Sequence, residues 1–213
     1  CLGGGWEDAR MDFIGENPAI GDPTRPLLLL LHGFGADEND LAGIVPWFGD
    51  GVDWVSVRAP LALPQHGFAW VPLGQPPLSA ALHAATDALL EWIDATAQGR
   101  RIVPLGFSQG GLMVTQLLRA RPSAFEAGVV LSGFVDPRPQ PGDTELAEHL
   151  PPVFFGWGGA DQIIPESIFV ATKDWLHEHT VLTQHRIPML GHGIDRDMLG
   201  AVAEFLSETL SSQ

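Results

Sequence analysis

The sequence predicts an α/β fold, with helices on both faces of a mostly parallel central sheet. Short apolar runs without polar alternation recur along the chain, and such runs are typical of strands that are buried on both faces. Segments with the apolar spacing of helices separate these runs, as expected where helical crossovers join parallel strands. No internal repeat or linker interrupts the alternation. We therefore expect a single domain over residues 11–213, without a separate cap domain.

In the first half of the chain, the elements follow from apolar runs and the residues that break them. Leu27–Leu31 is apolar throughout and predicts a buried strand. A short helix capped by Asp37 follows, and Asp53–Arg58 predicts the next strand. Prolines and glycines make 60–77 a long loop, which is unusual in a compact domain unless the loop has a function. Helical spacing then predicts a helix over 78–97.

In the second half of the chain, predicted strands and helices alternate more regularly. Strands are expected at Ile102–Leu105, Gly128–Ser132, Val153–Trp157 and Thr183–Ile187. Helices are expected at Gln109–Arg119, from Pro165 to about His179, and at Ile194–Leu210. A Pro-rich loop is expected at Asp136–Gly142. Pro104 falls in the strand that should be most central, where it cannot donate a ladder hydrogen bond, so we expect a local bulge there.

Charge and composition exclude several classes of partner. The chain has 11 basic and 26 acidic residues and a net charge of −15, so no basic patch is available for nucleic acid or an anionic membrane surface. No apolar run approaches the length of a membrane-spanning helix, so no stable membrane insertion is expected. Cys1 is the only cysteine, which excludes an intramolecular disulfide and a Cys-rich metal site. A cytoplasmic location is expected.

The first ten residues do not resemble the start of a folded domain. We interpret residues 1–10 as a loose tail or an expression remnant, with Met11 as the natural start. A mature lipoprotein anchored through Cys1 is the alternative.

The segment Gly106-Phe107-Ser108-Gln109-Gly110 has the pattern Gly-x-Ser-x-Gly, with a predicted strand before it and a predicted helix after it. A serine on such a tight turn has a strained backbone, and bulky residues two positions away on either side would collide. The helix that follows aims unpaired backbone N–H groups at the serine, which favours negative charge there. The bare motif is common, but this context predicts that Ser108 is a nucleophile rather than part of an ordinary turn.

A serine hydroxyl needs an imidazole to take its proton, and the imidazole needs a carboxylate to hold its tautomer. In a parallel sheet, the carboxyl ends of the strands gather such residues at one edge. Asp161 and His192 each follow a predicted strand, and with Ser108 they give the chain order Ser, Asp, His. Asp136 follows another strand and remains the alternative acid.

Motifs along most of the chain make the pattern more specific. They are Leu-His-Gly-Phe-Gly-Ala-Asp-Glu-Asn-Asp at 31–40, Gly-Phe-Ser-Gln-Gly-Gly at 106–111, Leu-Ser-Gly at 131–133, Asp161 with Ile-Ile-Pro after it, and Gly-His at 191–192. With these motifs, the chain from Pro26 to Leu210 resembles the phospholipase/carboxylesterase family, which includes the acyl-protein thioesterases. The resemblance implies the α/β-hydrolase fold, with Ser108 as nucleophile, Asp161 as acid and His192 as base. It also implies an oxyanion hole formed by the backbone N–H groups of Phe34 and Gln109.

Four apolar residues on loops at the active end of the sheet are expected to line an acyl site: Phe34, Trp70, Trp157 and Met189. His32 is expected to be structural, with hydrogen bonds to loop backbone near the oxyanion hole. His177 and His179 are two positions apart and do not share a helix face, so they are not expected to bind metal.

These observations predict a serine carboxylesterase that hydrolyses small to medium carboxylic esters through an acyl-enzyme on Ser108, without a metal or other cofactor. The expected partner is a small-molecule ester. Acyl-thioesterase or lysophospholipase-type activity is the alternative, since the same acyl-enzyme serves all of these substrates. From a different class, the alternative is a catalytically silent ligand-binding homologue. The presence of Ser108, Asp161 and His192 together argues against this alternative. The sequence leaves a homodimer open.

Overall fold

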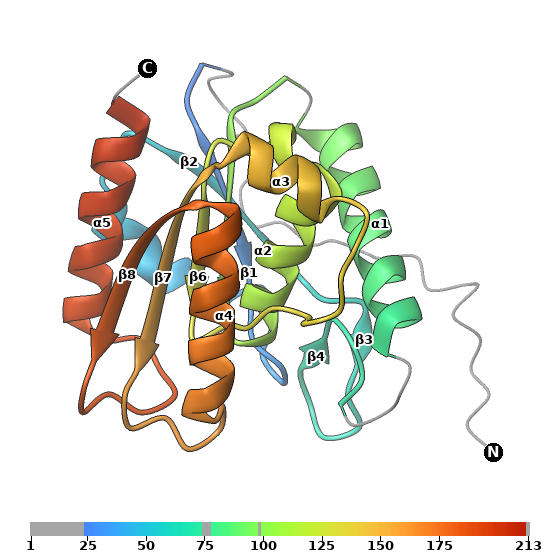
Figure 1. Ribbon diagram of the computed structural model, residues 1–213, viewed down its shortest axis with the longest axis vertical. Coiled ribbons are helices and arrows are strands. Elements are labelled where there is room, and N and C mark those ends of the chain that lie inside the picture. The colour runs from blue at the N-terminus through green and yellow to red at the C-terminus, as the bar shows by residue number, and fades with distance from the viewer. Residues whose placement is uncertain (1–23, 74–77, 98, 212–213) are drawn as a thin grey trace.

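A six-stranded parallel sheet forms the centre of the computed structural model, which describes residues 24–73, 78–97 and 99–211 (Figure 1). From one edge to the other, the strands are β2 (Asp53–Val57), β1 (Leu27–Leu31), β5 (Ile102–Phe107), β6 (Gly128–Leu131), β7 (Pro152–Gly158) and β8 (Val181–Ile187). Each neighbouring pair is parallel, so all six strands end at the same edge of the sheet, the lower edge in Figure 1. The predicted α/β fold is confirmed.

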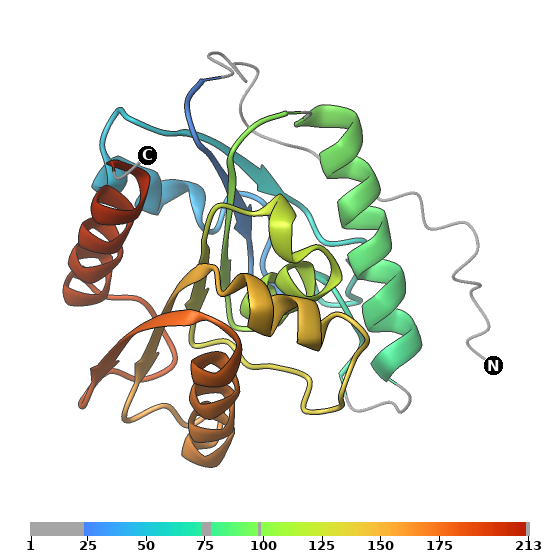
Figure 2. The ribbon, with the colours of Figure 1, turned by 45° about the horizontal axis from the view of Figure 1, so that its top comes forward.

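Helices cover both faces of this sheet, as Figures 1 and 2 show. One face packs against α1 (Leu78–Thr96), α2 (Gln109–Ala120), α3 (Asp143–His149) and α4 (Glu166–His179). The other face packs against α5 (Arg196–Ser211) and the 3-10 helix η2 (Ala42–Phe48). A short 3-10 turn, η3 (Pro122–Ala124), follows α2. No helix in the described ranges is both long and apolar enough to cross a membrane.

The leucine run of β1 explains why the sheet is covered on both sides. Successive side chains of a strand point to opposite faces, and a strand of five leucines is therefore apolar on both. Leu27, Leu29 and Leu31 belong to the core under α1 and α2, whereas Leu28 and Leu30 belong to the core under α5. Each is at most 1% exposed, so the prediction of a strand buried on both faces is confirmed.

Pro104 does not interrupt β5. The register between β1 and β5 continues without a break from Leu27 opposite Ile102 to Leu31 opposite Gly106, with Pro104 opposite Leu29. No bulge is present on the β1 side. On the other side, an isolated bridge pairs Ile102 with Phe125, and the regular pairing with β6 begins with Leu105 opposite Val129. A step of three residues along β5 thus corresponds to a step of four along its partner, so the expected local irregularity lies on this side, next to the proline that lacks an N–H.

The remaining differences concern short elements. The helix after β1 starts at Ala42, and Asp37 accepts a hydrogen bond from the N–H of Asn39 (2.9 Å) in a turn instead of capping the helix. Within the expected 60–77 loop, Leu61–Ala62 and Phe68–Ala69 form a two-stranded antiparallel sheet, β3–β4. Helix α3 lies in a stretch for which the sequence predicted no element. The predictions for residues 1–10, including Cys1, lie outside the described residues.

Candidate active site

Ser108 joins the end of β5 to the start of α2, at the edge of the sheet where the strands end. Its backbone has φ 54° and ψ −114°, a strained conformation for a residue with a side chain. A Cβ on Gly106 would overlap the backbone of Gly110, and a Cβ on Gly110 would overlap the carbonyl of Leu31. The two glycines of the motif are therefore required by close approach of backbone on both sides of the serine.

The structure brings Ser108, His192 and Asp161 into one chain of hydrogen bonds. The Nε2 atom of His192 lies 3.0 Å from Oγ of Ser108, and its Nδ1 atom lies 2.6 Å from Oδ2 of Asp161. Since an ionised carboxylate only accepts, the Nδ1 atom carries the proton and Nε2 is free to accept the hydroxyl proton. The geometry is that of a serine activated by an imidazole, which a carboxylate orients.

The carboxylate of Asp161 is held in place by backbone. It sits in the loop after β7, where its side chain is only 1% exposed. Its second oxygen accepts the N–H groups of Ile163 (2.8 Å) and Ile164 (3.0 Å). Phe107 packs its ring against the imidazole of His192, with the ring centres 4.9 Å apart. Both partners of the serine are thus fixed before any substrate arrives.

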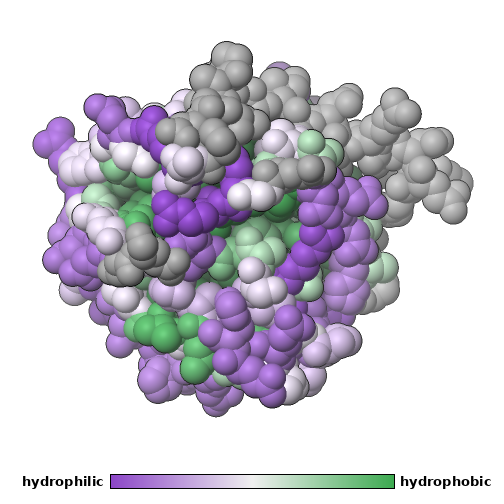
Figure 3. All heavy atoms as spheres, turned by 90° about the horizontal axis from the view of Figure 1, so that it is seen from above, coloured by the Kyte–Doolittle hydropathy of each residue, from purple (hydrophilic) through white to green (hydrophobic). Residues whose placement is uncertain are grey.

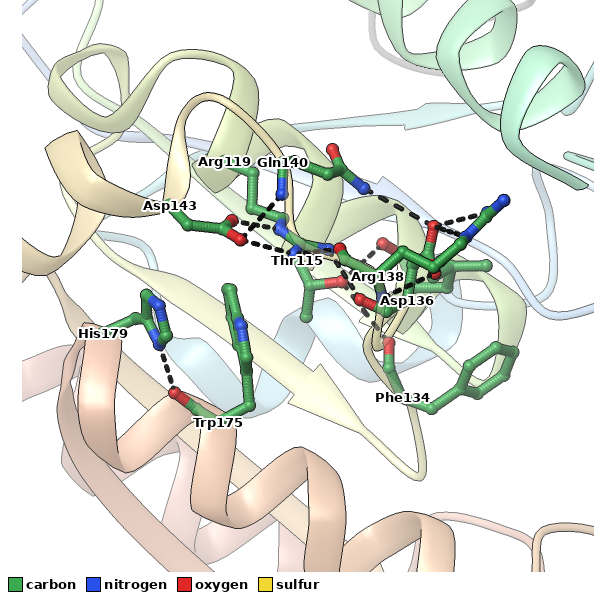
Figure 4. A network of polar contacts seen from close by, with 10 residues as sticks. Thr115, Arg119, Phe134, Asp136, Arg138, Gln140, Asp143, Trp175 and His179 are labelled. Atoms are coloured by element: carbon green, nitrogen blue, oxygen red, sulfur yellow. Dashed lines mark hydrogen bonds and ion pairs between the residues drawn. The ribbon is translucent and has the colours of Figure 1, made fainter.

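Asp136, the alternative acid, is paired with Arg138, as Figure 4 shows. Its carboxylate accepts hydrogen bonds from the guanidinium of Arg138 at 2.6 to 3.1 Å, and its carbonyl accepts one from Arg119 (2.8 Å). Burial raises the pKa of the Asp136 carboxyl, but the hydrogen bonds and charge of Arg138 outweigh burial, so this pKa lies below its usual range. In the described part of the chain, no hydrogen bond joins Asp136 to His192.

The two N–H groups expected to form an oxyanion hole belong to the turn after β1 and to the start of α2. Phe34 is in the turn that follows β1, and Gln109 is the first residue of α2, so its N–H has no acceptor within the helix. Gly33 lets the two loops approach, because a Cβ there would already lie 3.1 Å from the ring of Phe107.

His32 is buried and holds the turn that carries Phe34. Its Nδ1–H donates to the carbonyl of Gly33 (2.7 Å), and its Nε2 accepts the N–H of Ala59 (3.0 Å). Burial lowers the pKa of His32, which keeps the ring neutral as these two bonds require. The expectation that His32 is structural agrees with these contacts.

The expected acyl-site residues divide into two groups. Phe34 is 40% exposed and Met189 is 86% exposed, so both present apolar surface on loops at the candidate site. Trp70 is completely buried and Trp157 is stacked on Phe155 in the core, so neither offers surface to a ligand. The predicted pocket needs correction at these two positions. Trp157 belongs to β7 and not to a loop, and the burial of Trp70 depends on tertiary packing that the sequence does not display.

Two further apolar side chains are exposed on loops at the same end, Leu73 (64%) and Ile163 (67%). Ile163 follows Asp161 closely, a proximity that could have drawn attention to it in the sequence. Further apolar residues are exposed outside these loops. Leu150 precedes β7 and Val181 begins β8, at the end of the molecule viewed in Figure 3, where apolar areas lie among hydrophilic ones. In the described ranges, no three His, Cys, Asp or Glu side chains gather as metal ligands.

The chain is similar to known proteins both in sequence and in fold. The family model described as phospholipase/carboxylesterase matches residues 75–210. Among solved structures, a carboxylesterase of Bacillus cereus is similar with a TM-score of 0.80 and 22% identity, over 95% of this chain and 96% of that one. Esterase PE8 is similar with a TM-score of 0.75 and 23% identity, over 92% of this chain and 99% of that one. At these identities, the structural likeness shows the fold.

A curated relative matches only a part of the chain. It is the pimeloyl-[acyl-carrier protein] methyl ester esterase of Aromatoleum aromaticum, 37% identical over 99 residues. The match includes 46% of this chain and 34% of the relative, so the chain spans about a third of that protein's length.

Proposed function

The chain belongs to the phospholipase/carboxylesterase family of α/β-hydrolases, and from this premise we propose that it is a serine carboxylesterase acting on small to medium carboxylic esters. The observation that carries the proposal is the hydrogen-bond chain from Ser108 through His192 to Asp161. The family alone supports an esterase-type hydrolase; the serine mechanism rests on this geometry.

In the proposed reaction, Oγ of Ser108 attacks the ester carbonyl while Nε2 of His192 takes the hydroxyl proton. The negative charge that develops on the carbonyl oxygen is stabilised by the backbone N–H groups of Phe34 and Gln109, and removal of one such donor typically costs about 10²–10³ in rate. His192 then gives its proton to the leaving alcohol, and the acyl group stays on Ser108. In the second half of the reaction, His192 takes a proton from water, which attacks the acyl-enzyme. His192 then returns the proton to Oγ of Ser108 as the bond to the acyl group breaks and the acid is released.

The apolar surface near the site favours an acyl group with some hydrocarbon. Phe34, Leu73, Ile163 and Met189 are exposed on loops at this end of the molecule. Covering such side chains with an acyl chain removes apolar area from water, which stabilises the complex by about 0.8 kcal/mol per CH₂ that is fully buried. Thioesters remain the nearest alternative substrates, because the same acyl-enzyme would form from them.

Rates on matched oxygen esters and thioesters, from acetyl to dodecanoyl, would test the proposal. We expect oxygen esters to be hydrolysed, with kcat/KM rising over the first few carbons of the acyl chain. A fluorophosphonate reagent should form its adduct on Ser108, as located by peptide mass spectrometry. Ser108→Ala should abolish both the turnover and the adduct. An adduct on another serine, or full activity of Ser108→Ala, would refute the mechanism.

A further inference from the structure

We propose that Trp70 is a positioning residue that fixes the spacing between the two N–H donors of the oxyanion hole. The inference rests on the proposed function, and it gives this buried side chain a role other than contact with substrate. Trp70 lies just after β4 and has no exposed surface, yet it contacts the segments that carry both donors.

The first contact is with Gln109. The side-chain Oε1 of Gln109 accepts the backbone N–H of Trp70 (2.7 Å), and its Nε2 donates to the carbonyl of Val71 (2.7 Å). A longer bond joins the N–H of Val71 to the same Oε1 (3.4 Å). The amide of Gln109 thus pairs with the backbone at 70–71 as a neighbouring strand would. The residue whose own N–H is an oxyanion donor is tied by its side chain to Trp70.

The second contact is with the turn that carries Phe34. The indole Nε1–H of Trp70 donates to the carbonyl of His32 (2.9 Å), and the rings of Trp70 and His32 lie 5.6 Å apart. Slightly earlier in the same segment, Phe68 accepts the N–H of Gly35 (2.8 Å) and donates to the carbonyl of Ala36 (2.8 Å). Residues on both sides of Phe34 are therefore held by the segment 68–71.

The two sets of contacts make Trp70 a bridge. Its backbone N–H is bonded to the side chain of Gln109, on the helix side of the oxyanion hole. Its indole N–H is bonded to the carbonyl of His32, on the turn side. Both bonds are buried, and a buried partner left unsatisfied is costly, so each end resists displacement. Oxyanion donors are effective only when they lie about 2.7–3.1 Å from the developing charge, and the distance between them must therefore be held within a few tenths of an ångström.

The variant Trp70→Phe isolates the indole bond. Phenylalanine keeps an aromatic ring and the backbone bond to Gln109, but it cannot donate to the carbonyl of His32. We expect kcat to fall about tenfold, which is less than the loss of about 10²–10³ that follows when an oxyanion donor is removed. KM should stay within about twofold of its original value. A boronic acid that forms a tetrahedral adduct with Ser108 should bind more weakly by a similar factor. The control is Trp54→Phe on β2, where a half-buried tryptophan packs against the other core, and kcat should stay within about twofold.

The variant Gln109→Met tests the other end of the bridge, because it removes the side-chain contacts and leaves the N–H of residue 109 in place. We expect a similar loss of kcat. In the double variant with Trp70→Phe, the loss should be clearly smaller than the product of the two single losses, since residues that act as one unit are not additive. Independent, multiplying effects would contradict a shared bridge.

Amide hydrogen exchange measures the bridge without reference to catalysis. The N–H of Gly35 should exchange at least about tenfold faster in Trp70→Phe than in Trp54→Phe at matched global stability. Wild-type kcat in Trp70→Phe, or an unchanged exchange rate at Gly35, would overturn the proposal. If Ser108→Ala kept full activity instead, the proposed function would fail, and the exchange measurement would still decide whether Trp70 holds the turn.

Discussion

The guanidinium of Arg119 lies 4.7 Å from the ring centre of Trp175, which stacks in turn on His179 at 4.3 Å (Figure 4). Arg119 sits near the end of α2, whereas Trp175 belongs to α4. The same guanidinium donates to both carboxylate oxygens of Asp143 (2.6 and 2.9 Å), at the start of α3. One buried side chain therefore joins three helices on one face of the sheet.

Removal of this side chain should be strongly destabilising. Arg119→Met keeps most of the volume but takes the guanidinium away from the carboxylate of Asp143, which keeps only the N–H of Gln140, and from two loop carbonyls. Breaking one partner of a buried pair typically costs about 3–5 kcal/mol, and we expect a loss of this size in urea unfolding. The matched control is Arg121→Met, whose exposed pair with Asp94 should contribute little to stability, because solvent screens exposed charges. Equal losses in the two variants would contradict this assignment.

Asp161 and Asp136 should respond differently to the same substitution. Asp161→Asn removes the acceptor for Nδ1–H of His192 and favours the wrong tautomer of the ring, so kcat should fall by at least about 10²-fold. Asp136→Asn weakens only contacts with Arg138 and Gln140, and kcat should change less than about threefold. Steady-state kinetics at saturating ester would measure both, with circular dichroism to establish that both variants are folded. A larger kcat loss in Asp136→Asn would reassign the acid.

Gly110 should not tolerate even a methyl group. Gly110→Ala would drive its Cβ into the carbonyl of Leu31, and overpacking of this kind costs about 3 kcal/mol or more where the obstacle is backbone. We expect loss of both thermal stability and fluorophosphonate labelling. Gly200 in α5 has open space around its Cα, so Gly200→Ala should instead stabilise the protein by about 0.5–1 kcal/mol. Calorimetric unfolding of the two variants checks both the expected loss and the expected gain of stability. If Gly110→Ala has no effect, the turn at Ser108 can relax around the added methyl group.

His32 should make stability depend on pH. Burial lowers its pKa in the folded state, so below the ordinary value of about 6.5 the unfolded chain binds a proton that the folded chain does not. Stability should therefore fall as the pH drops from about 6.5 toward the folded pKa, by at most about 1.4 kcal/mol per pH unit from this residue. His32→Gln keeps a donor and an acceptor but cannot titrate.

The slope of unfolding free energy against pH between 5.5 and 6.5 should be smaller in His32→Gln than in the natural protein. The carboxyl of Glu38, whose pKa is lowered by its hydrogen bonds with Arg58, contributes only at lower pH, below its ordinary value of 4.5. Identical slopes in the two proteins would mean that a protonated His32 is accommodated in the fold.

The parts of the fold that sequence predicts well are those in which local pattern and tertiary environment agree. The leucines of β1 are apolar on both faces, and both faces are covered. By contrast, α3 consists of seven residues with four acidic or imidazole side chains, and much of its support comes from Arg119, far away in the sequence. No local pattern predicts such a helix, because Arg119, which stabilises it, is not close in the sequence.

The candidate site shows the same division. Ser108, Asp161 and His192 could be brought together in advance because each follows a strand of one parallel sheet. The burial of Trp70 could not be foreseen, since it depends on the side chain of Gln109 and the carbonyl of His32. A tryptophan in a loop rich in Pro and Gly has the same sequence signature whether it faces solvent or supports a neighbouring turn.

The separation of the site residues along the chain has a consequence for refolding. His192 is 31 residues from Asp161 and 84 residues from Ser108. The strained turn at Ser108 is stable only when the backbone around it is packed. Contacts of such long sequence separation form late, because loop closure must precede them. After dilution from denaturant, fluorophosphonate labelling should consequently appear later than the circular dichroism signal of the helices, which makes the nucleophile a reporter for the last step of folding.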